Sequence, residues 1–249
     1  MFDLPIPLLA AVVTTFFAAG LVKGITGMGL PTVAMAVLGA LISPLAAASL
    51  LIVPSFVTNV WQLLIGPSFG PLLRRLWPMM LAIVAGTVTG SAWIVGGDPG
   101  LATSMLGLAL VIYSAYTLFA VQLSVRQGQE RWLSPLIGGI TGGVTGGTGV
   151  LVIPAVPYLQ ALGLSKDDLV QALGLSFTVS TVALAIGLGT HGALQSDHIV
   201  LSMLAVVPAL GGMWAGQNIR KRISPIAFRR GFLLGLMLLG CELALRPLF

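Results

Sequence analysis

Long apolar runs, each closed by glycine, proline or a short polar loop, fill almost the whole chain. An α-helix rises about 1.5 Å per residue, so about 20 apolar residues cross the ~30 Å hydrocarbon layer of a membrane. The second run of each half reaches only about 20 Å, which predicts a half-helix or a re-entrant arm. The runs cover residues 5–22, 31–42, 45–65, 72–95 and 101–121 in the first half, and residues 132–140, 150–162, 169–188, 198–219 and 226–245 in the second. This pattern predicts an all-α integral membrane protein with about five helical segments in each half.

Two glycine-rich stretches that contain threonine interrupt the apolar pattern. They are residues 24–31 (GITGMGLP) and residues 142–149 (GGVTGGTG), and Gly29 and Gly149 lie 120 residues apart. Unwound backbone is tolerated at membrane depth only where it is enclosed or lines a cavity. Paired breaks at matching points of two halves therefore predict the binding site of a secondary transporter, with a broken or re-entrant helix pair opening each half.

Composition narrows the class of protein further. The chain is 57% hydrophobic and 8% charged, which excludes a soluble enzyme because so few polar residues cannot cover a soluble surface. The single cysteine, Cys241, excludes an internal disulfide and a thiolate metal cluster. The net charge of +5 does not indicate nucleic-acid binding, because the basic residues lie at segment ends.

The placement of lysine and arginine predicts the orientation in the membrane. Cytoplasmic loops are enriched in these residues, and the loops around Pro44, Asp98 and Gln195 carry none. The two halves then run in opposite directions, which predicts two inverted-topology repeats at residues 1–121 and 132–249, a cytoplasmic connector at 122–131, and both termini outside. The residues assigned to the cytoplasmic side are Arg74, Arg75, Arg126, Arg131, Lys166, Arg220, Lys221, Arg222, Arg229 and Arg230.

The chain resembles the sulfite exporter TauE/SafE family, also called the toluenesulfonate uptake permeases. The resemblance rests on a length of about 250 residues, the glycine-rich break entering a proline-containing arm in each half, and the serine and threonine segment that follows. It implies a permease of the bacterial inner membrane that moves sulfite, sulfoacetate or another organosulfonate by alternating access, with export as the expected direction. The chain has GMG and GTG where the family most often has three glycines.

A broken helix suits an oxyanion, because the first residues of an α-helix carry unpaired N–H groups and about half a positive charge. A half-helix that starts after Gly29 or Gly149 is therefore predicted to donate hydrogen bonds to the anion. Lys23, beside the first break, either attracts the anion or extends its ammonium to the membrane surface. The predicted substrate-binding residues of the breaks are Lys23, Thr26, Gly27 and Gly29, and Thr145, Gly147, Thr148 and Gly149.

The third segment of each half carries a stripe of polar side chains. Residues three and four apart share a helix face, so the first stripe is predicted to converge on one cavity. The amides of Asn59 and Gln62 need partners in hydrocarbon, whereas hydroxyls in membrane helices often bond back to their own carbonyls. The candidate substrate-binding residues of the two stripes are Ser55, Thr58, Asn59 and Gln62, and Ser176 and Ser180.

Other glycines are predicted to permit close helix crossing by small side chains. These pairs are Gly86 with Gly90, Gly212 with Gly216, and Gly231 with Gly235. The predicted register of the repeat matches Pro78 and Gly86 with Pro208 and Gly216.

All seven acidic residues lie at or near segment ends, so no mid-membrane carboxylate is available as a proton relay. No cofactor or metal is expected: the glycine stretches lack the P-loop lysine, and His191 and His198 have no clear third ligand. The expected partners are the anionic substrate and the lipid bilayer. Two alternatives stay open, namely a transporter of another small solute and an intramembrane serine hydrolase built on Ser176 and His191.

Overall fold

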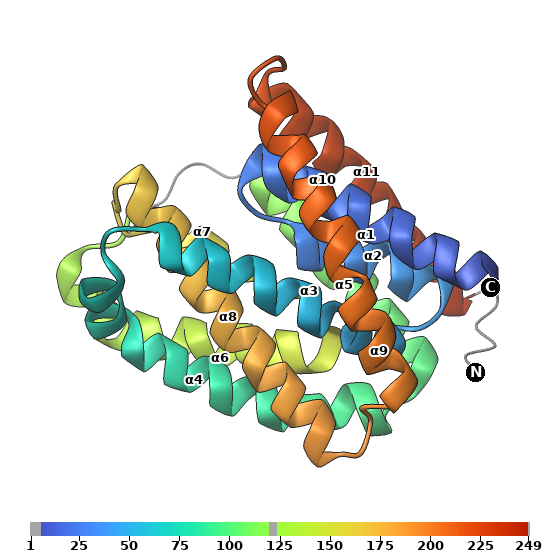
Figure 1. Cartoon of the computed structure of the whole chain (residues 1–249). Coiled ribbons are helices and arrows are strands. Elements are labelled where there is room, and N and C mark those ends of the chain that lie inside the picture. The colour runs from blue at the N-terminus through green and yellow to red at the C-terminus, as the bar shows by residue number, and fades with distance from the viewer. Residues whose placement is uncertain (1–5, 120–123, 249) are drawn as a thin grey trace.

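The computed structural model describes residues 6–119 and 124–248, and these residues are helical with short connections (Figure 1). The predicted run ends at Pro5 and Val121 and the beginning of the connector at Gln122 lie outside the described residues. The helices are α1 (Ile6–Thr26), α2 (Leu30–Leu41), α3 (Pro44–Ile65), α4 (Phe69–Gly96), α5 (Pro99–Phe119), α6 (Glu130–Thr148), α7 (Ala155–Ala161), α8 (Lys166–Thr190), α9 (Ser196–Leu204), α10 (Val206–Ile219) and α11 (Pro225–Leu245), with short 3₁₀ turns at Gln127–Gln129 and Arg246–Leu248.

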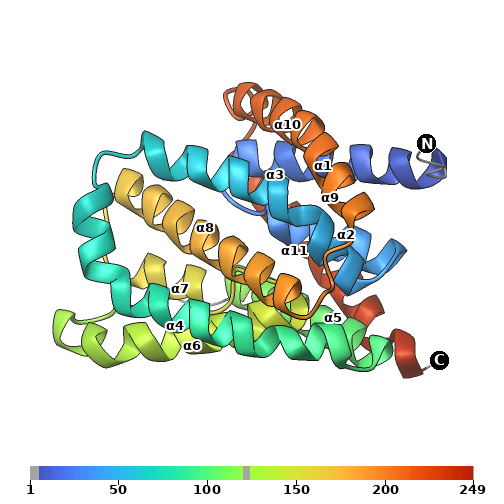
Figure 2. The same ribbon diagram turned by 60° about the horizontal axis from the view of Figure 1, so that its bottom comes forward.

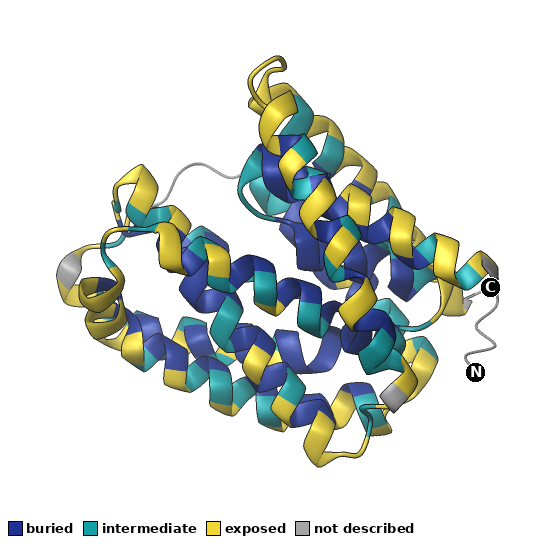
Figure 3. Cartoon of the chain, viewed as in Figure 1, coloured by how far each residue is buried: buried dark blue, intermediate teal, exposed yellow. Residues whose placement is uncertain are grey.

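Within residues 6–119 and 124–248, six helices are long and apolar enough to cross a membrane: α1, α3, α4, α5, α8 and the continuous pair α9–α10. Exposed residues, yellow in Figure 3, occur along the outside of the bundle. They include large apolar side chains, among them Trp61, Val207 and Trp214. Such side chains suit contact with lipid rather than water. The chain is therefore a multi-pass membrane protein.

Serine and proline set the beginning of three long helices. Ser43 accepts a hydrogen bond from Ala46 N (3.1 Å), and Ser165 accepts one from Asp168 N (3.2 Å). Ser224 acts in the same way at the start of α11. Pro44 and Pro225 occupy the first helical position, where the missing N–H costs nothing.

The first break is confined to three residues between α1 and α2. Gly27 has φ 83° and donates its N–H to Lys23 O (2.8 Å), which closes the last turn of α1. Gly29 has φ 105° and immediately precedes α2, so the predicted half-helix after Gly29 is confirmed. Positive φ values are readily adopted only by glycine. The 12 residues of α2 extend about 18 Å, which is too short to cross the membrane.

The second break differs from its prediction. Helix α6 continues through the glycine stretch to Thr148, so only Gly149, with φ 72°, ends it. The expected half-helix directly after Gly149 is wrong, because residues 150–154 are not helical and α7 has only seven residues. Pro154 follows a cis peptide bond at the beginning of α7.

Glycines in α1 and α10 bring these helices into backbone contact, and the two run side by side in Figures 1 and 2. A Cβ added at Gly20 would lie 2.1 Å from Ala209 O, and one at Gly24 would lie 2.3 Å from Met213 O. The second contact lies four residues after the first on both helices, so α1 and α10 run in the same direction. A side chain at either glycine would force the helices apart.

The same arrangement joins α6 to α4. A Cβ at Gly142 would lie 2.4 Å from Ile83 O, and one at Gly146 would lie 2.4 Å from Thr87 O. The glycines before Gly149 thus serve packing, which explains why they do not interrupt the helix. Helix α3 also packs against α8, and α5 packs against α11.

The packing role predicted for glycine pairs is confirmed for two pairs. Gly86, Gly90, Gly212 and Gly216 each face the backbone of the neighbouring helix. The pair Gly231 and Gly235 was assigned wrongly, because a Cβ at either position meets no described atom within 4 Å. Spacing alone does not say which face of α11 a neighbour covers.

Gly142→Ala should destabilise the protein by about 1–3 kcal/mol, because its methyl group would collide with the backbone of α4. The matched control is Gly143→Ala on the same helix, where a Cβ meets nothing within 4 Å. That variant should be neutral or stabilised by up to about 1 kcal/mol, since alanine favours helix. Thermal unfolding in detergent micelles measures both, and equal midpoints would contradict the packing of α6 on α4.

Candidate functional site

A cavity of about 440 Å³ lies between the end of α1, the second half of α3, the beginning of α8 and the end of α10. Its wall mixes apolar side chains with amides, hydroxyls and charged groups. The residues that give it chemical character are Lys23, Gly27, Thr58, Trp61, Gln62, Asp167, Gln171, Gln217 and Arg220.

Lys23 places a buried cation on this cavity. Its residue is only 3% exposed, and its Nζ donates to Thr58 Oγ1 (3.2 Å) and to Asn59 Oδ1. Asn59 Nδ2 then donates to Ser55 Oγ (3.0 Å), and Ser55 lies 3.2 Å from the hydroxyl of Thr181 on α8. In the part of the chain that the structure describes, no acidic side chain forms an ion pair with Lys23.

The local sequence explains how α1 and α3 present these side chains. Lys23 lies one turn before the end of α1, and its carbonyl oxygen accepts the bond from Gly27 that ends the helix. Ser55 and Asn59 are four residues apart and share the face of α3 that meets α1 and α8.

A proline in the same stretch of α3 creates the attachment point for α9. Pro54 has no N–H, so it leaves Leu50 O without its helical donor. Ser202 of α9 donates to that oxygen (2.7 Å) and accepts from Val53 N (3.1 Å). Helix α3 is thereby attached to α9 beside the polar stripe.

Of the first predicted stripe, Thr58 and Gln62 line the cavity, whereas Ser55 and Asn59 lie buried behind it. Gln62 Nε2 donates to Val170 O of α8 (2.8 Å). The structure therefore brings the whole stripe together with Lys23, two residues at the wall and two in the layer below.

Gln171 is a cavity residue that the sequence analysis missed. It is buried; its Nε2 donates to Leu63 O and Gly66 O (2.8 Å each), and its Oε1 accepts from Ser68 N (2.7 Å). These bonds hold the beginning of α8 to the turn between α3 and α4. An amide within an apolar run needs partners, and that reasoning, applied to Asn59 and Gln62, applies equally to Gln171.

Charge at the cavity favours an anion. Lys23 and Arg220 contribute two positive charges, and Asp167 contributes one negative charge. Arg220 and Asp167 are exposed, whereas Lys23 is buried. The cation at the inner wall is thus the one least screened by solvent.

The threonines at the breaks bond to the backbone. Thr26 Oγ1 donates to Val22 O (2.9 Å) or Met28 O (2.7 Å), and Thr148 Oγ1 donates to Val144 O (2.6 Å). The predicted residues Thr26, Gly29, Thr145, Gly147, Thr148, Gly149, Ser176 and Ser180 do not line the 440 Å³ cavity. Thr26 and Gly29 border a hollow of about 10 Å³ with Arg229. The hydroxyls of Ser176 and Ser180 are buried and have no partner among the described residues.

The proposed hydrolase pair is wrong. Ser176 and His191 both belong to the α8 segment, where their separation along the helix is about 22 Å. A serine nucleophile and its base must lie within hydrogen-bonding distance, so these two residues cannot act together.

Apolar membrane-spanning helices around a polar cavity fit the class of multi-pass membrane transporters. The family model "Sulfite exporter TauE/SafE" matches residues 12–243, and the chain belongs to this family. Searches of the curated proteins and of the solved structures gave no match.

Gln171→Leu should destabilise the protein by about 1–3 kcal/mol or more, because it leaves the N–H of Ser68 and two carbonyl oxygens without a protein partner. Gln217→Leu is the control, since Gln217 is exposed on the same cavity. Thermal unfolding in detergent should separate the two variants. Similar midpoints would show that the Gln171 bonds do not stabilise the α3–α4 turn.

Proposed function

We propose that the chain is a permease that moves a small sulfur-containing oxyanion, such as sulfite, sulfoacetate or another organosulfonate, by alternating access. Its family supports a transporter of sulfur anions. The proposed membrane is the bacterial inner membrane, and the proposed direction is export, which the membrane potential (negative inside) drives without a coupling ion.

The observation that carries this proposal is the buried ammonium of Lys23 on the cavity. Burying a cation costs several kcal/mol unless charge and hydrogen bonds compensate. Thr58 and Asn59 offer neutral oxygens only. An oxyanion in the cavity supplies the missing negative charge, and its further oxygens can accept from the second N–H of Gln62 Nε2, whose first N–H bonds to Val170 O.

The size of the cavity agrees with this class of substrate. About 440 Å³ admits an organosulfonate as well as sulfite, and Trp61, Ile65 and Met213 give it an apolar wall for an organic group. Gly27 leaves the end of α1 accessible to the anion because it has no side chain.

We further propose that residues 1–121 and 132–249 are inverted repeats joined by a connector at 122–131. Equivalent bonds support this: Gly27 N donates to Lys23 O and Gly149 N donates to Thr145 O, both at 2.8 Å. Each threonine that precedes these glycines bonds four residues back. The packing of α1 on α10 is equivalent to the packing of α6 on α4. Each pair joins the first helix of one half to the fourth segment of the other half.

These contacts favour a different register from the one that the sequence pattern predicts. Gly27, rather than Gly29, is the counterpart of Gly149. Gly86 contacts α6 as Gly212 contacts α1, so Gly86 pairs with Gly212 rather than with Gly216. In this register Lys23 corresponds to Thr145.

The proposed symmetry also assigns a role to the predicted site residues of the second half. In the opposite state of the transporter, an equivalent cavity forms at the end of α6. The unpartnered hydroxyls of Ser176 and Ser180 then gain water or substrate as partners. The residues proposed to line that cavity are Thr145, Gly147, Thr148, Gly149, Ser176 and Ser180.

Lys23→Gln should raise the apparent Kd for sulfite by about tenfold or more, since a hydrogen bond to a charged group contributes about 1.5–3 kcal/mol. Asn59→Asp keeps the size of the side chain and should weaken binding similarly, because its carboxylate neutralises Lys23. Lys166→Gln, at an exposed lysine of α8, should bind as the parent does. The apparent affinities of all four proteins come from the concentration dependence of uptake of labelled sulfite, sulfoacetate and taurine into proteoliposomes.

Unchanged binding of every substrate by folded Lys23→Gln protein would reject the anion site. Transport of none of these substrates by the parent, together with transport of an uncharged solute, would reject the substrate class and favour the alternative of a different small solute.

Orientation gives a separate test. With the clustered basic residues in the cytoplasm, both termini lie outside. In a Cys241→Ala background, Gln195→Cys should react with an impermeant thiol reagent added to intact cells, and Gly128→Cys should react only after permeabilisation. Both target positions are exposed. Labelling of Gly128→Cys in intact cells would overturn the orientation.

A further inference from the structure

A second cavity, of about 500 Å³, lies between the beginnings of α4 and α6, which the proposed orientation places in the cytoplasm, apart from the cavity assigned to the substrate. It is lined by Arg75, Trp77, Pro78, Glu130, Arg131 and Ser134. No residue is shared between the two walls. The two cavities are thus separate places in the fold.

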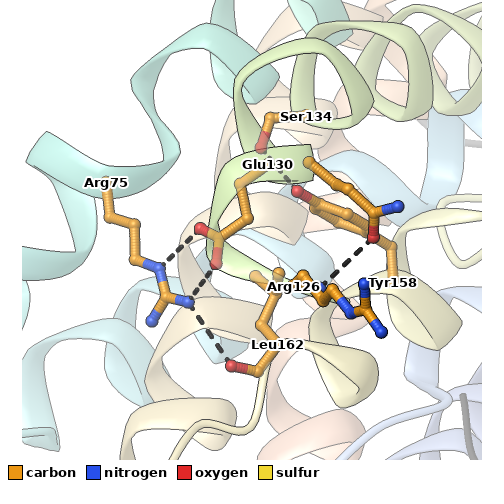
Figure 4. Close-up of polar contacts among 7 residues, drawn as sticks. Arg75, Arg126, Glu130, Ser134, Tyr158 and Leu162 are labelled. Carbon is orange, nitrogen blue, oxygen red and sulfur yellow. Dashed lines mark hydrogen bonds and ion pairs between the residues drawn. The ribbon is translucent and has the colours of Figure 1, made fainter. Parts of the chain in front are cut away.

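The charges of this cavity leave one cation in excess. Figure 4 shows Glu130 holding Arg75 with both carboxylate oxygens: Arg75 Nε donates to Oε2 (2.9 Å) and Nη2 donates to Oε1 (2.6 Å). The Nη2 group also approaches Leu162 O (3.4 Å), while Nη1 makes no bond to a described atom. Arg131 is exposed and forms no ion pair with any residue that the structure describes.

The neighbouring side chains leave the arginines as the charged donors of this cavity. Ser134 Oγ lies 2.6 Å from the hydroxyl of Tyr158 on α7, so one of these two O–H groups donates to the other (Figure 4). Glu130 is neutralised by Arg75. A ligand in this cavity therefore meets Arg131 and the free Nη1 of Arg75, both of which suit phosphate oxygens.

The cavity also lies at the level of the lipid headgroups. Helix α4 has 28 residues, about eight more than the ~20 needed to cross a bilayer. We assign these extra residues to the beginning of the helix, where Arg74 and Arg75 lie. Figure 2 shows that these first turns bend away from the rest of α4, and Pro78, inside the helix, accounts for a bend there. Trp77 is 55% exposed, and tryptophan favours the membrane interface.

Apolar surface continues from the cavity into the membrane. Leu81, one turn beyond Trp77 on the same face of α4, is 60% exposed. Trp77 and Leu81 face lipid acyl chains whatever fills the cavity. A phospholipid offers its headgroup to the arginines and an acyl chain to these two side chains in one molecule. The continuity of the polar and apolar surfaces thus favours a phospholipid over a soluble anion.

We propose that this cavity binds the phosphodiester headgroup of an anionic phospholipid. Arg131 and Arg75 Nη1 donate to the phosphate oxygens, and the first acyl chain packs along Trp77 and Leu81. The bound lipid joins the beginnings of α4 and α6, which are already linked by the ion pair of Arg75 with Glu130.

Quenching of Trp77 by brominated lipid tests the site in the full chain. The other four tryptophans are replaced by phenylalanine, and the protein is reconstituted in phosphatidylcholine vesicles that contain brominated phosphatidylglycerol or brominated phosphatidylcholine. Trp77 should prefer phosphatidylglycerol by roughly fivefold or more, the effect of one or more arginines near an anionic lipid. Arg131→Gln should bring the preference close to one, and Arg222→Gln, at an exposed arginine on the same membrane side, should leave it unchanged.

Absence of a phosphatidylglycerol preference in the parent would overturn the proposal. Equal losses in Arg131→Gln and Arg222→Gln would also overturn it, because they would indicate attraction by the net charge of the surface. A further arm adds inorganic phosphate, matched in ionic strength with potassium chloride. Specific loss of the preference in phosphate would show that the cavity takes the free anion instead of the lipid.

Discussion

The backbone groups released at the two helix breaks are the constraint on which the rest of the structure depends. A polar group without a partner in hydrocarbon costs several kcal/mol. Gly27 and Gly149 donate back to the last helical turn, and Thr26 and Thr148 supply hydroxyls to the neighbouring backbone. Helices α1 and α6 can therefore end inside the protein without unsatisfied groups at those positions.

Close packing at glycines of α1 positions Lys23 at the proposed substrate cavity. Gly20 and Gly24 let α1 lie directly on the backbone of α10. Helix α1 also packs on α2, and the Lys23 side chain reaches from its last turn to α3. Lys23 consequently meets Asn59 of α3 rather than water. The polar side chains of α3 thus gain a cation that their own helix does not provide, and the cavity that results suits an oxyanion.

The two proposed sites use arginine and lysine in different ways. At the substrate cavity, Lys23 is buried and bonded only to neutral oxygens, so a mobile anion gains a strong partner there. At the α4–α6 cavity, Arg75 is bonded to Glu130, and the exposed Arg131 provides the surplus charge next to apolar surface. An exposed cation at the interface suits a ligand that is always present at high local concentration, as lipid is.

Hydropathy and helix length were sufficient to predict an all-helical membrane protein, because the cost of burying backbone in lipid leaves few alternatives to the helix. The short second run and the break at Gly29 were predictable for the same reason. The end of α6 was not, because glycine can either break a helix or pack it against another, and only contact with α4 keeps Gly142 and Gly146 helical. The position of the Lys23 side chain likewise depends on α3 and α10. A lysine near a helix end can extend to the surface or turn inward, and the partners that hold Lys23 inward come from segments distant in the chain.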